Sequence, residues 1–396
     1  MITSDLYQRK QDCCGCELCS IVCSKQIIEM KEDEEGFLYP HIKDESSCIN
    51  CKLCLRVCPE KAPGRQFNTP LKSFGGSVND TQSVKESSSG GFATAISTAF
   101  VRQGGVVYGV RYSEDFRAIE FDRAETVDEL SCFRTSKYAQ AHKNDIYKSV
   151  QRDLNEGCRV LFVGLPCEIS ALYHFVKKSE NLYTISLICH GPTSQKVHRQ
   201  FCDNIKLEVG GDELTYFSMR HKKSGWKPYY LLVKFKNGAE YLREFNRTDY
   251  DVAFKYLKRP SCSVCKYKLG NADFGLVADL VLGDYHAVKK NSPEYNSWGV
   301  SQATALTKQG EELLALLNGR ATLHPISQKI IATTNIALRA PIPQKKYRAQ
   351  FSSSFCKDGL HKASRQPSVQ FEIKKNKMIR DIKRLIVTFR NIVFHR

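Results

Sequence analysis

The stretch CCGCELCSIVC, residues 13–23, places five cysteines within eleven residues near the start of the chain. Four of them have the spacing C-x2-C-x2-C-x3-C, namely Cys13, Cys16, Cys19 and Cys23. A second stretch, CINCKLCLRVCPEKAP at residues 48–63, repeats that spacing with Cys48, Cys51, Cys54 and Cys58. The repeat predicts a small module over residues 1–65, built around two sets of sulfur ligands and ending at a Pro63–Gly64 break.

Two consecutive runs of this kind are typical of bacterial ferredoxins that carry two 4Fe–4S clusters. Three cysteines on a tight loop ligate one cluster, and the fourth, on the following helix, reaches the neighbouring cluster. A structural zinc site is the alternative, but zinc sites use well-separated ligand pairs with a longer spacer. We therefore predict an α+β ferredoxin-like domain in which Cys13, Cys16, Cys19 and Cys58 ligate one cluster and Cys48, Cys51, Cys54 and Cys23 ligate the other.

The two runs differ in detail. Ser24 stands where the second run has Pro59, and Cys14 is an additional cysteine without a counterpart. We expect Cys14 to be a bystander.

The length and composition favour an intracellular globular protein. A chain of 396 residues with 42% hydrophobic and 26% charged residues predicts two or three domains. The net charge of +17 is diffuse and partly C-terminal, which disfavours nucleic-acid binding. No apolar run is long enough for a transmembrane helix and no secretory signal is visible, so we expect a cytoplasmic protein whose seventeen cysteines are free for metal or redox chemistry.

Downstream of the ferredoxin module, the hydrophobic pattern predicts an α/β core with a mixed sheet. Residues 73–91 are rich in Ser, Gly and Asn and predict an exposed loop. A helix is expected from residue 91, strands at 106–112 and 278–288, and a strand, turn and helix across 158–178. An apolar strand leads into Cys189, Asn237-Gly238 indicates a hairpin, and residues 308–319 predict a helix ending at a glycine.

Four scattered cysteines occupy suggestive positions in this core. Loops at one edge of an α/β sheet converge, so single cysteines at strand ends can meet a C-x2-C pair from elsewhere. The sequence thus predicts a third four-thiolate site, against the alternatives of a zinc site or unconnected thiols, from Cys167, Cys189, Cys262 and Cys265.

The motifs of this core, in their order along the chain, resemble the coenzyme F420 hydrogenase/dehydrogenase beta-subunit family. They are SSSGGFATAI (87–96), FVGLPCEISAL (162–172), LICHG (187–191), SGW (224–226), CSVCKYKLGNADFGLVADLVLGDY (262–285) and WGVSQATALT (298–307). The resemblance covers about residues 70–345. It implies a flavin-binding core with FAD and its own 4Fe–4S cluster, held by the four cysteines named above. Similar members with a fused ferredoxin also occur in bacterial polysaccharide gene clusters.

The same resemblance implies positions for the flavin. A Ser-Gly-Gly turn before a helix suits a pyrophosphate, because backbone N–H groups approach it closely, although such a turn is more often only a helix cap. Asp284 matches a family motif near the cofactor, with the capping of a turn as the simpler role. The cofactor-binding candidates are Ser88, Ser89, Gly90, Gly91, Phe92, Arg134, Ser136, Lys137, Tyr138 and Asp284.

Two residues are candidates for catalysis. His190, beside Cys189, is a candidate proton donor, or it holds its turn through a hydrogen bond. Lys223, with Gly225 and Trp226, is a candidate for the substrate pocket, where a solvated charge run is the alternative.

The sequence ends in a basic segment. After residue 345 we expect a tail whose end, residues 377–396, forms an amphipathic helix with Met378, Ile382, Leu385, Phe389 and Ile392 on one stripe. This helix is a candidate for peripheral contact with an anionic membrane or a partner, against the alternative of packing on its own domain. The expected domains are therefore 1–65, 66–345 and 346–396.

Together these features predict a flavin-dependent iron–sulfur oxidoreductase. Electrons would pass between a deazaflavin or small organic substrate, FAD, the core cluster, the two ferredoxin clusters and a redox partner protein. The alternative is a non-catalytic electron-transfer subunit that serves a partner enzyme.

Overall fold

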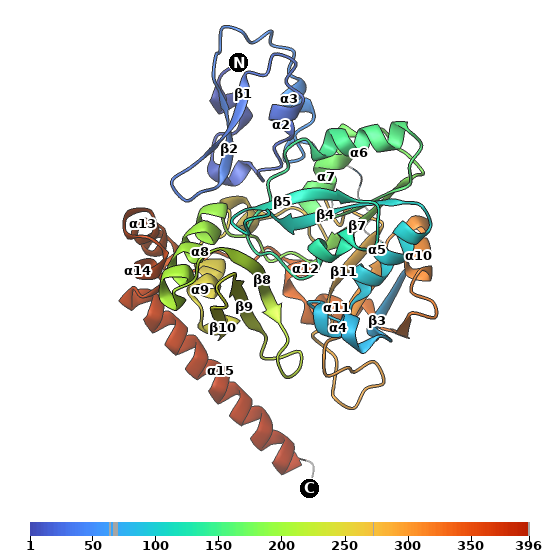
Figure 1. The fold of residues 1–396 in the computed structure, drawn as a ribbon, viewed down its shortest axis with the longest axis vertical. Coiled ribbons are helices and arrows are strands. Elements are labelled where there is room, and N and C mark those ends of the chain that lie inside the picture. The colour runs from blue at the N-terminus through green and yellow to red at the C-terminus, as the bar shows by residue number, and fades with distance from the viewer. Residues whose placement is uncertain (63–64, 66–69, 272, 395–396) are drawn as a thin grey trace.

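The computed structural model describes residues 1–62, 65, 70–271 and 273–394, and within the last helix it describes side chains only up to residue 382, without residue 380. Figure 1 shows a small N-terminal lobe on one end of a larger body, and a long C-terminal helix that extends away from that body. The break expected at Pro63–Gly64 lies outside the described residues.

The N-terminal lobe is built on the cysteine repeat. It contains α1 (Thr3–Leu6), η1 (Lys10–Asp12), α2 (Leu18–Ile21), α3 (Leu53–Arg56) and the antiparallel strands β1 (Ile28–Glu32) and β2 (Leu38–Ile42). The helices α2 and α3 each follow a left-handed residue, Glu17 (φ 65°) and Lys52 (φ 59°), at equivalent positions of the two runs. The repeat in sequence is thus a repeat in backbone conformation, as expected for a ferredoxin-like domain.

An eight-stranded mixed sheet forms the centre of the body. Its strand order is β13-β3-β12-β11-β7-β6-β4-β5, and the inner strands β11, β7, β6 and β4 run parallel. The strands are β3 (Lys72–Val78), β4 (Val106–Tyr112), β5 (Ile119–Ala124), β6 (Val160–Gly164), β7 (Leu182–Leu187), β11 (Leu280–Asp284), β12 (Ser301–Ala305) and β13 (Ala321–Pro325).

Helices cover both faces of this sheet. Tyr108 and Phe162 point to the face packed by α6 (Ile146–Asn155) and α7 (Pro166–Phe175). Val107 and Leu161 point to the opposite face, packed by α5 (Phe92–Arg102) and α10 (Lys308–Ala315). Burial on both faces explains why the inner strands are continuous apolar runs in the sequence. The remaining short elements on this part of the body are α4 (Thr81–Glu86), η2 (Glu129–Phe133), α11 (Gln328–Thr334) and α12 (Ile336–Arg339).

A smaller antiparallel sheet lies beside the main one. Strands β8 (Leu214–His221), β9 (Tyr230–Phe235) and β10 (Glu240–Glu244) form it, and α8 (Gln195–Val209), η3 (Phe245–Arg247) and α9 (Asp249–Tyr256) pack around it. The predicted hairpin at Asn237-Gly238 is present between β9 and β10, with Gly238 at φ +86°.

The loop expected over residues 73–91 is wrong. Most of its first part is β3, which pairs with β12 on one side and β13 on the other, and α4 follows it. The small residues that suggested a loop serve close packing instead: a Cβ on Gly76 would lie 1.9 Å from the Thr322 carbonyl oxygen.

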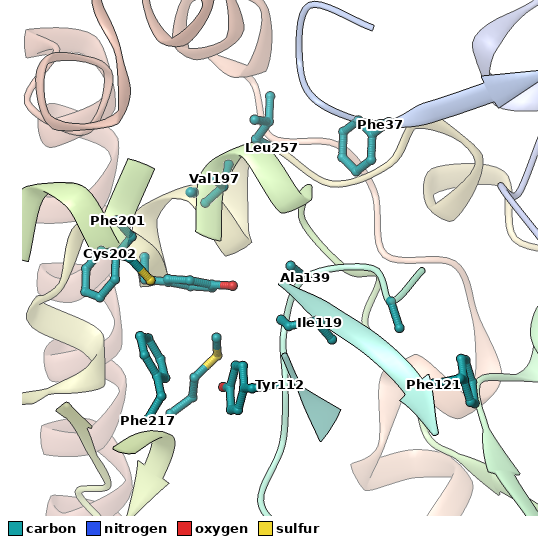
Figure 2. Close-up of a cluster of buried hydrophobic side chains, with 14 of the residues drawn as sticks. Phe37, Tyr112, Ile119, Phe121, Ala139, Val197, Phe201, Cys202, Phe217 and Leu257 are labelled. Atoms are coloured by element: carbon teal, nitrogen blue, oxygen red, sulfur yellow. The ribbon is translucent and has the colours of Figure 1, made fainter. Parts of the chain in front are cut away.

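The lobe and the body share one hydrophobic core. Phe37, from the lobe, belongs to the same buried cluster as Val197 and Leu257 of the body. Figure 2 shows Phe37 beside Leu257, with Ala139 and the aromatic side chains of the body below them. The lobe is therefore packed against the body as part of its interior.

The segment expected as a tail begins with packed helices. In α13 (Arg348–Asp358) and α14 (Leu360–Ser364), the side chains of Phe351, Phe355 and Leu360 are buried in the main core. Only α15 (Pro367–Phe394) extends outward (Figure 1), with Phe371 and Met378 exposed. Leu385, Phe389 and Ile392 of the predicted stripe lie outside the described side chains. Among the described residues, no helix is both long and apolar enough to cross a bilayer.

Candidate functional site

The structure gathers the lobe cysteines into two groups. In the first, burial raises the pKa of the Cys19 thiol well above its usual range; the neighbouring thiols of Cys13 and Cys58 raise it further, and that of Cys54 from the second run less so. Cys16 also has Cys58 and Cys19 as electrostatic neighbours. We call Cys13, Cys16, Cys19 and Cys58 the first set; the fourth residue comes from the second run.

The second group lies farther from the body. Burial raises the pKa of the Cys54 thiol, whose thiol neighbours are Cys23 and Cys51. Cys48 and Cys23 pack in the same small hydrophobic cluster as Cys54. We call Cys48, Cys51, Cys54 and Cys23 the second set. Cys51 is exposed, so this set reaches the surface of the lobe.

The four core cysteines also meet, although they come from three distant segments. Cys167 lies in the first turn of α7, Cys189 follows β7, and the pair Cys262 and Cys265 is carried by η4 (Pro260–Val264) and the residue after it. Burial raises the pKa of the Cys262 thiol well above its usual range, and the thiols of Cys189, Cys265 and Cys167 raise it further. We call these four residues the core set.

Gly191 holds two members of the core set together. Its N–H donates to Cys189 Sγ at 3.2 Å. A Cβ on Gly191 would lie 2.8 Å from Cys262 Cβ, so only glycine, here at φ +90°, fits between the two thiols.

The donor chemistry of the three sets fits 4Fe–4S clusters, which are held by four thiolates each. Cations lie near the core set, as an anionic cluster requires: Lys268 Nζ donates to the Cys189 carbonyl oxygen at 3.3 Å, and Lys258 has Cys262 and Cys189 as electrostatic neighbours. Among the described residues, no three His, Cys, Asp or Glu side chains are gathered closely enough to ligate a single metal ion.

The first set and the core set face each other across the interface of lobe and body. The Cys14 thiol, only 6% exposed, has both Cys16 of the first set and Cys167 of the core set as neighbours. A bystander position was expected for Cys14, but its side chain lies directly between the two sets. Gln140 Nε2 supports this loop by donating to the Cys14 carbonyl oxygen at 2.8 Å.

Arg259 fills the rest of this interface. Its side chain is buried, and its Nε donates to the Cys13 carbonyl oxygen at 2.8 Å. Its Nη2 donates to the Leu38 carbonyl oxygen at 2.8 Å and approaches Cys13 Sγ at 3.5 Å, while Nη1 donates to Gln140 Oε1 at 3.0 Å. The planar guanidinium of arginine carries several N–H donors that point in different directions, so one side chain can serve all of these acceptors.

Gly15 provides a test of this packing. It has φ +67°, and a Cβ there would lie 2.5 Å from Arg259 Nη1. We expect Gly15→Ala to lower the free energy of unfolding by more than the roughly 1–3 kcal/mol that left-handed strain alone costs, measured by urea denaturation. Gly104→Ala is the matched control, since Gly104 has φ +81° and a Cβ there would have no described atom within 4 Å. Equal losses in the two variants would contradict the packing role of Arg259.

The predicted flavin loop is assembled, but much of it is used by the protein itself. Ser136 Oγ donates to Ser88 Oγ at 3.0 Å, which joins the two predicted flavin segments. The Gly90 N–H donates to Ser301 Oγ, and a Cβ on Gly90 would lie 2.5 Å from the Gly76 carbonyl oxygen. Phe92 is buried in the core. The glycines therefore permit close packing within the sheet.

The basic candidates of the second segment also have partners in the protein. Arg134 pairs with Glu86. Lys137 Nζ donates to the carbonyl oxygens of Cys132 and Arg134 at 2.9 and 2.8 Å, and burial lowers the pKa of Lys137 to about 7. Tyr138 stacks on Phe254 with ring centroids 4.6 Å apart.

Asp284 is part of a buried polar group that the sequence did not reveal. It forms an ion pair with Arg220 Nη1 at 2.9 Å, and the two side chains are 16% and 8% exposed. The Arg220 guanidinium lies 4.8 Å from the centroid of the Tyr229 ring, and Asp284 is an electrostatic neighbour of His286. Arg220 carries a full charge in the interior, directly beside the predicted flavin loop.

Two buried donors in this region have no partner within the described part of the chain. They are Arg220 Nε and Trp226 Nε1; the Trp226 ring stacks on His286, at 6.4 Å between centroids. Unsatisfied buried donors are rare in native proteins and call for an explanation. A bound polar ligand such as a flavin would satisfy them, so the donor set of this region fits the predicted cofactor.

The two catalytic candidates, His190 and Lys223, are both exposed but have different neighbours. His190 has an exposed side chain near the core set, with Lys258 and His286 as electrostatic neighbours. Lys223 is exposed and lies 5.8 Å from the centroid of the Tyr230 ring. Its neighbour Lys222 is the buried one, donating to the carbonyl oxygens of Val84 and Ser89 at 2.6 and 2.7 Å.

The sequence contains a signal for Arg220 and Lys222, which were not among the predicted site residues. Ser218 and Arg220 belong to β8 and Lys222 follows that strand; all three side chains are buried, as are Phe217 and Met219 at the alternate positions of the strand. Arginine and lysine at inward positions of a strand mark a polar interior, but the inward face could be chosen only after the neighbouring sheet was known.

Comparison with known proteins gives two matches to family models. Residues 157–329 match the family model for the C terminus of the beta subunit of coenzyme F420 hydrogenase/dehydrogenase, and residues 12–62 match the 4Fe-4S dicluster domain. These matches confirm the resemblance found in the motifs. A chain of the F420-reducing NiFe hydrogenase complex from Methanosarcina barkeri is 16% identical, with a TM-score of 0.46 over 68% of this chain and 89% of that chain. No curated protein sequence matches the chain.

Proposed function

We propose that this iron–sulfur electron-transfer protein, whose residues 157–329 match the coenzyme F420 hydrogenase/dehydrogenase beta-subunit family, is a flavin-dependent oxidoreductase with three 4Fe–4S clusters. The observations that support the proposal are the two cysteine runs of a 4Fe-4S dicluster domain and the mutual proximity of Cys167, Cys189, Cys262 and Cys265. The domain division at residue 65 is part of the same proposal, with 1–65 as the ferredoxin domain and 66–345 as the flavin and cluster core, to which α13 and α14 also contribute buried side chains.

The arrangement of the sets supports an order of carriers in the relay. The core set lies inside the body, the first set touches it through Cys14, and the second set reaches the exposed surface at Cys51. Single electrons would therefore move between the body and a redox partner through the first set and then the second. A partner that contacts the lobe near Cys51 would exchange electrons with the second set.

FAD, when bound, would supply the exchange between a two-electron substrate and single-electron carriers. The chain would hold it near Ser88, Ser136 and the Arg220–Asp284 pair, where the unsatisfied Arg220 Nε and Trp226 Nε1 are available as donors. His190 lies near both this region and the core set and is the proposed proton-exchanging group; burial lowers its pKa to about 4, so at neutral pH the neutral ring accepts a proton before it donates one. We propose a deazaflavin or a small organic molecule as the substrate, with polysaccharide synthesis as one setting.

Iron counting tests the three-cluster proposal. Anaerobically purified protein should contain about twelve irons per chain, with matching sulfide, and Cys262→Ser should contain about eight. Cys356→Ser is the control, because Cys356 lies in α13 outside all three sets, and it should leave the iron content unchanged. A Cys262→Ser variant that retains about twelve irons, or wild-type protein with zinc and no sulfide, would refute the core cluster.

The second candidate function is an electron-transfer subunit without a substrate site of its own. The exposed second set favours it, because such a surface serves a partner protein equally well. Purified chain that oxidises or reduces a small substrate with an artificial electron mediator supports the enzyme. Flavin-loaded chain that turns over only after a partner is added supports the subunit.

A further inference from the structure

We propose that Arg259 is a positioning residue that raises the reduction potential of the first-set cluster and thereby draws an electron from the core cluster into the ferredoxin lobe. The inference rests on the proposed function, since it requires that both sets hold 4Fe–4S clusters. It assigns a role to a residue that lies outside all of the predicted ligands and cofactor contacts.

The position of Arg259 in the chain connects the two sets. Its backbone belongs to the core-set loop: its N–H donates to the Pro192 carbonyl oxygen at 3.2 Å, and its own carbonyl oxygen accepts from the Cys262 N–H at 3.0 Å. Its guanidinium, however, crosses the interface to the first set, where it contacts Cys13 through both the carbonyl oxygen and Sγ. One residue is therefore fixed to the core set at its backbone, while its guanidinium contacts the first set directly and has Cys262 of the core set only as a weaker electrostatic neighbour.

The charge of Arg259 lacks a conventional counter-ion among its contacts with the described residues. Its acceptors are the carbonyl oxygens of Cys13 and Leu38, the side-chain amide of Gln140 and the sulfur of Cys13. With an exposure of 1%, the guanidinium has almost no contact with water. Glu17 and Glu60 are more distant electrostatic neighbours, and the centroid of the Tyr39 ring lies 4.4 Å from the guanidinium, but the only sulfur that the guanidinium contacts directly among the described residues is that of Cys13, where an anionic thiolate cluster would face it.

A fixed cation beside a cluster favours its reduced form. Reduction adds one negative charge to the cluster, and both nearby charge and hydrogen bonds to the ligand sulfurs tune the potential of iron–sulfur sites. The guanidinium lies against Cys13 and is held there by three further hydrogen bonds, so its field acts on the first set in a fixed geometry. With clusters bound at both sets, the electron that the core cluster lost would be the electron that the first-set cluster gained.

The test is an equilibrium redox titration of the holoprotein, followed by electron paramagnetic resonance. The signal that is lost in Cys16→Ser identifies the first-set cluster, and we call the titration curve of this signal the first-set wave. In Arg259→Met and Arg259→Gln, we expect this wave to move to more negative potential, with a change of tenfold or more in the ratio of reduced to oxidised cluster at fixed potential. Tenfold corresponds to about 59 mV for one electron. In Arg259→Lys, which keeps the charge, the change should be less than about threefold.

Arg348→Met is the matched control. Arg348 also joins the lobe to the body, through Nη1 and Nη2 to the Glu35 carboxylate at 2.9 and 2.6 Å, and its Nη2 also donates to the Lys258 carbonyl oxygen at 3.2 Å. It has no thiol among these contacts. This variant should loosen the docking of the lobe, seen as faster amide hydrogen exchange in β1 and β2, while the first-set wave stays in place.

Three results overturn the inference. The first is an unshifted wave in a neutral Arg259 variant that retains about twelve irons. The second is an equal shift in Arg348→Met, which would show that docking and not charge sets the potential. If both neutral variants lose iron, Arg259→Lys decides, and a shift of tenfold or more in it overturns the inference. Wild-type protein without iron and sulfide instead refutes the proposed function itself.

Discussion

Lys143→Met should lower the free energy of unfolding by about 3–5 kcal/mol, because it leaves a buried carboxylate without its counter-ion. Lys143 Nζ lies 2.9 Å from Glu168 Oε1, and the two side chains are 0% and 2% exposed. Burial alone would lower the pKa of Lys143, but Glu168 and Glu17 outweigh it and raise that pKa, so the lysine is charged in the folded protein.

The other contacts of this pair increase the loss in free energy of unfolding that follows removal of Lys143. Lys143 Nζ also donates to the Ala141 carbonyl oxygen at 2.6 Å, and its backbone N–H donates to Glu17 Oε1 at 3.2 Å. Glu168 Oε2 accepts from the Leu165 N–H at 2.8 Å, which caps α7. Since Cys167 lies beside Glu168 and Glu17 lies beside Cys16, the pair supports both the core set and the first set. Removal of Lys143 should therefore destabilise the loops of both.

Urea denaturation of protein prepared without iron–sulfur clusters measures the change in the free energy of unfolding separately from any change in iron binding. The double variant Lys143→Met/Glu168→Gln should recover part of the loss, because no buried charge then remains unpaired. Lys236→Met is the control: Lys236 and Glu213 form an ion pair at 2.9 Å with both side chains 67% exposed, and its loss should cost less than about 1 kcal/mol. Similar losses for the buried and the exposed lysine would show that the Lys143–Glu168 pair is open to water.

The cysteine repeat predicted the lobe well because ligand spacing is a local property of the chain. Two runs of four thiols constrain two tight loops, and the structure shows the same left-handed residue, Glu17 or Lys52, before each short helix. The core was predicted where apolar strands end in turns, as at β6 and β7. It was mispredicted at 73–91, because small residues that commonly form loops also allow the close strand packing seen at Gly76.

The parts of the site that sequence reasoning missed all depend on contacts between distant segments. Arg259 stands next to the C-x2-C pair, but its partners Cys13, Leu38 and Gln140 come from three other segments. Cys14 had no partner in the spacing pattern, and its contact with Cys167 exists only because the lobe packs on α7. Arg220 and Lys222 are charged residues in a strand context that normally predicts a solvated face.

Lys222→Met should remove a pH dependence of the free energy of unfolding that arises beside the predicted flavin loop. Burial, and secondarily the charge of Arg220, lower the pKa of Lys222 to about 7 from its usual 10.5. The unfolded chain thus binds one more proton than the folded chain between pH 7 and pH 10.5. The free energy of unfolding should therefore rise with pH in this window, by about 1.4 kcal/mol per pH unit from this residue.

The difference between variants isolates Lys222 from other titrating groups. Urea denaturation at pH 7 and pH 9 should show that wild-type protein gains about 2–3 kcal/mol more than Lys222→Met over this interval. Lys223→Met is the matched control, since Lys223 is the adjacent lysine and is exposed, and it should keep the wild-type gain. An equal gain in wild type and Lys222→Met would mean that Lys222 keeps its ordinary pKa. Its ammonium, held by the carbonyl oxygens of Val84 and Ser89, would then carry a full positive charge at neutral pH beside the predicted flavin loop. With the expected gain, by contrast, Lys222 exchanges its proton near neutral pH and is a proton-exchanging group beside that loop.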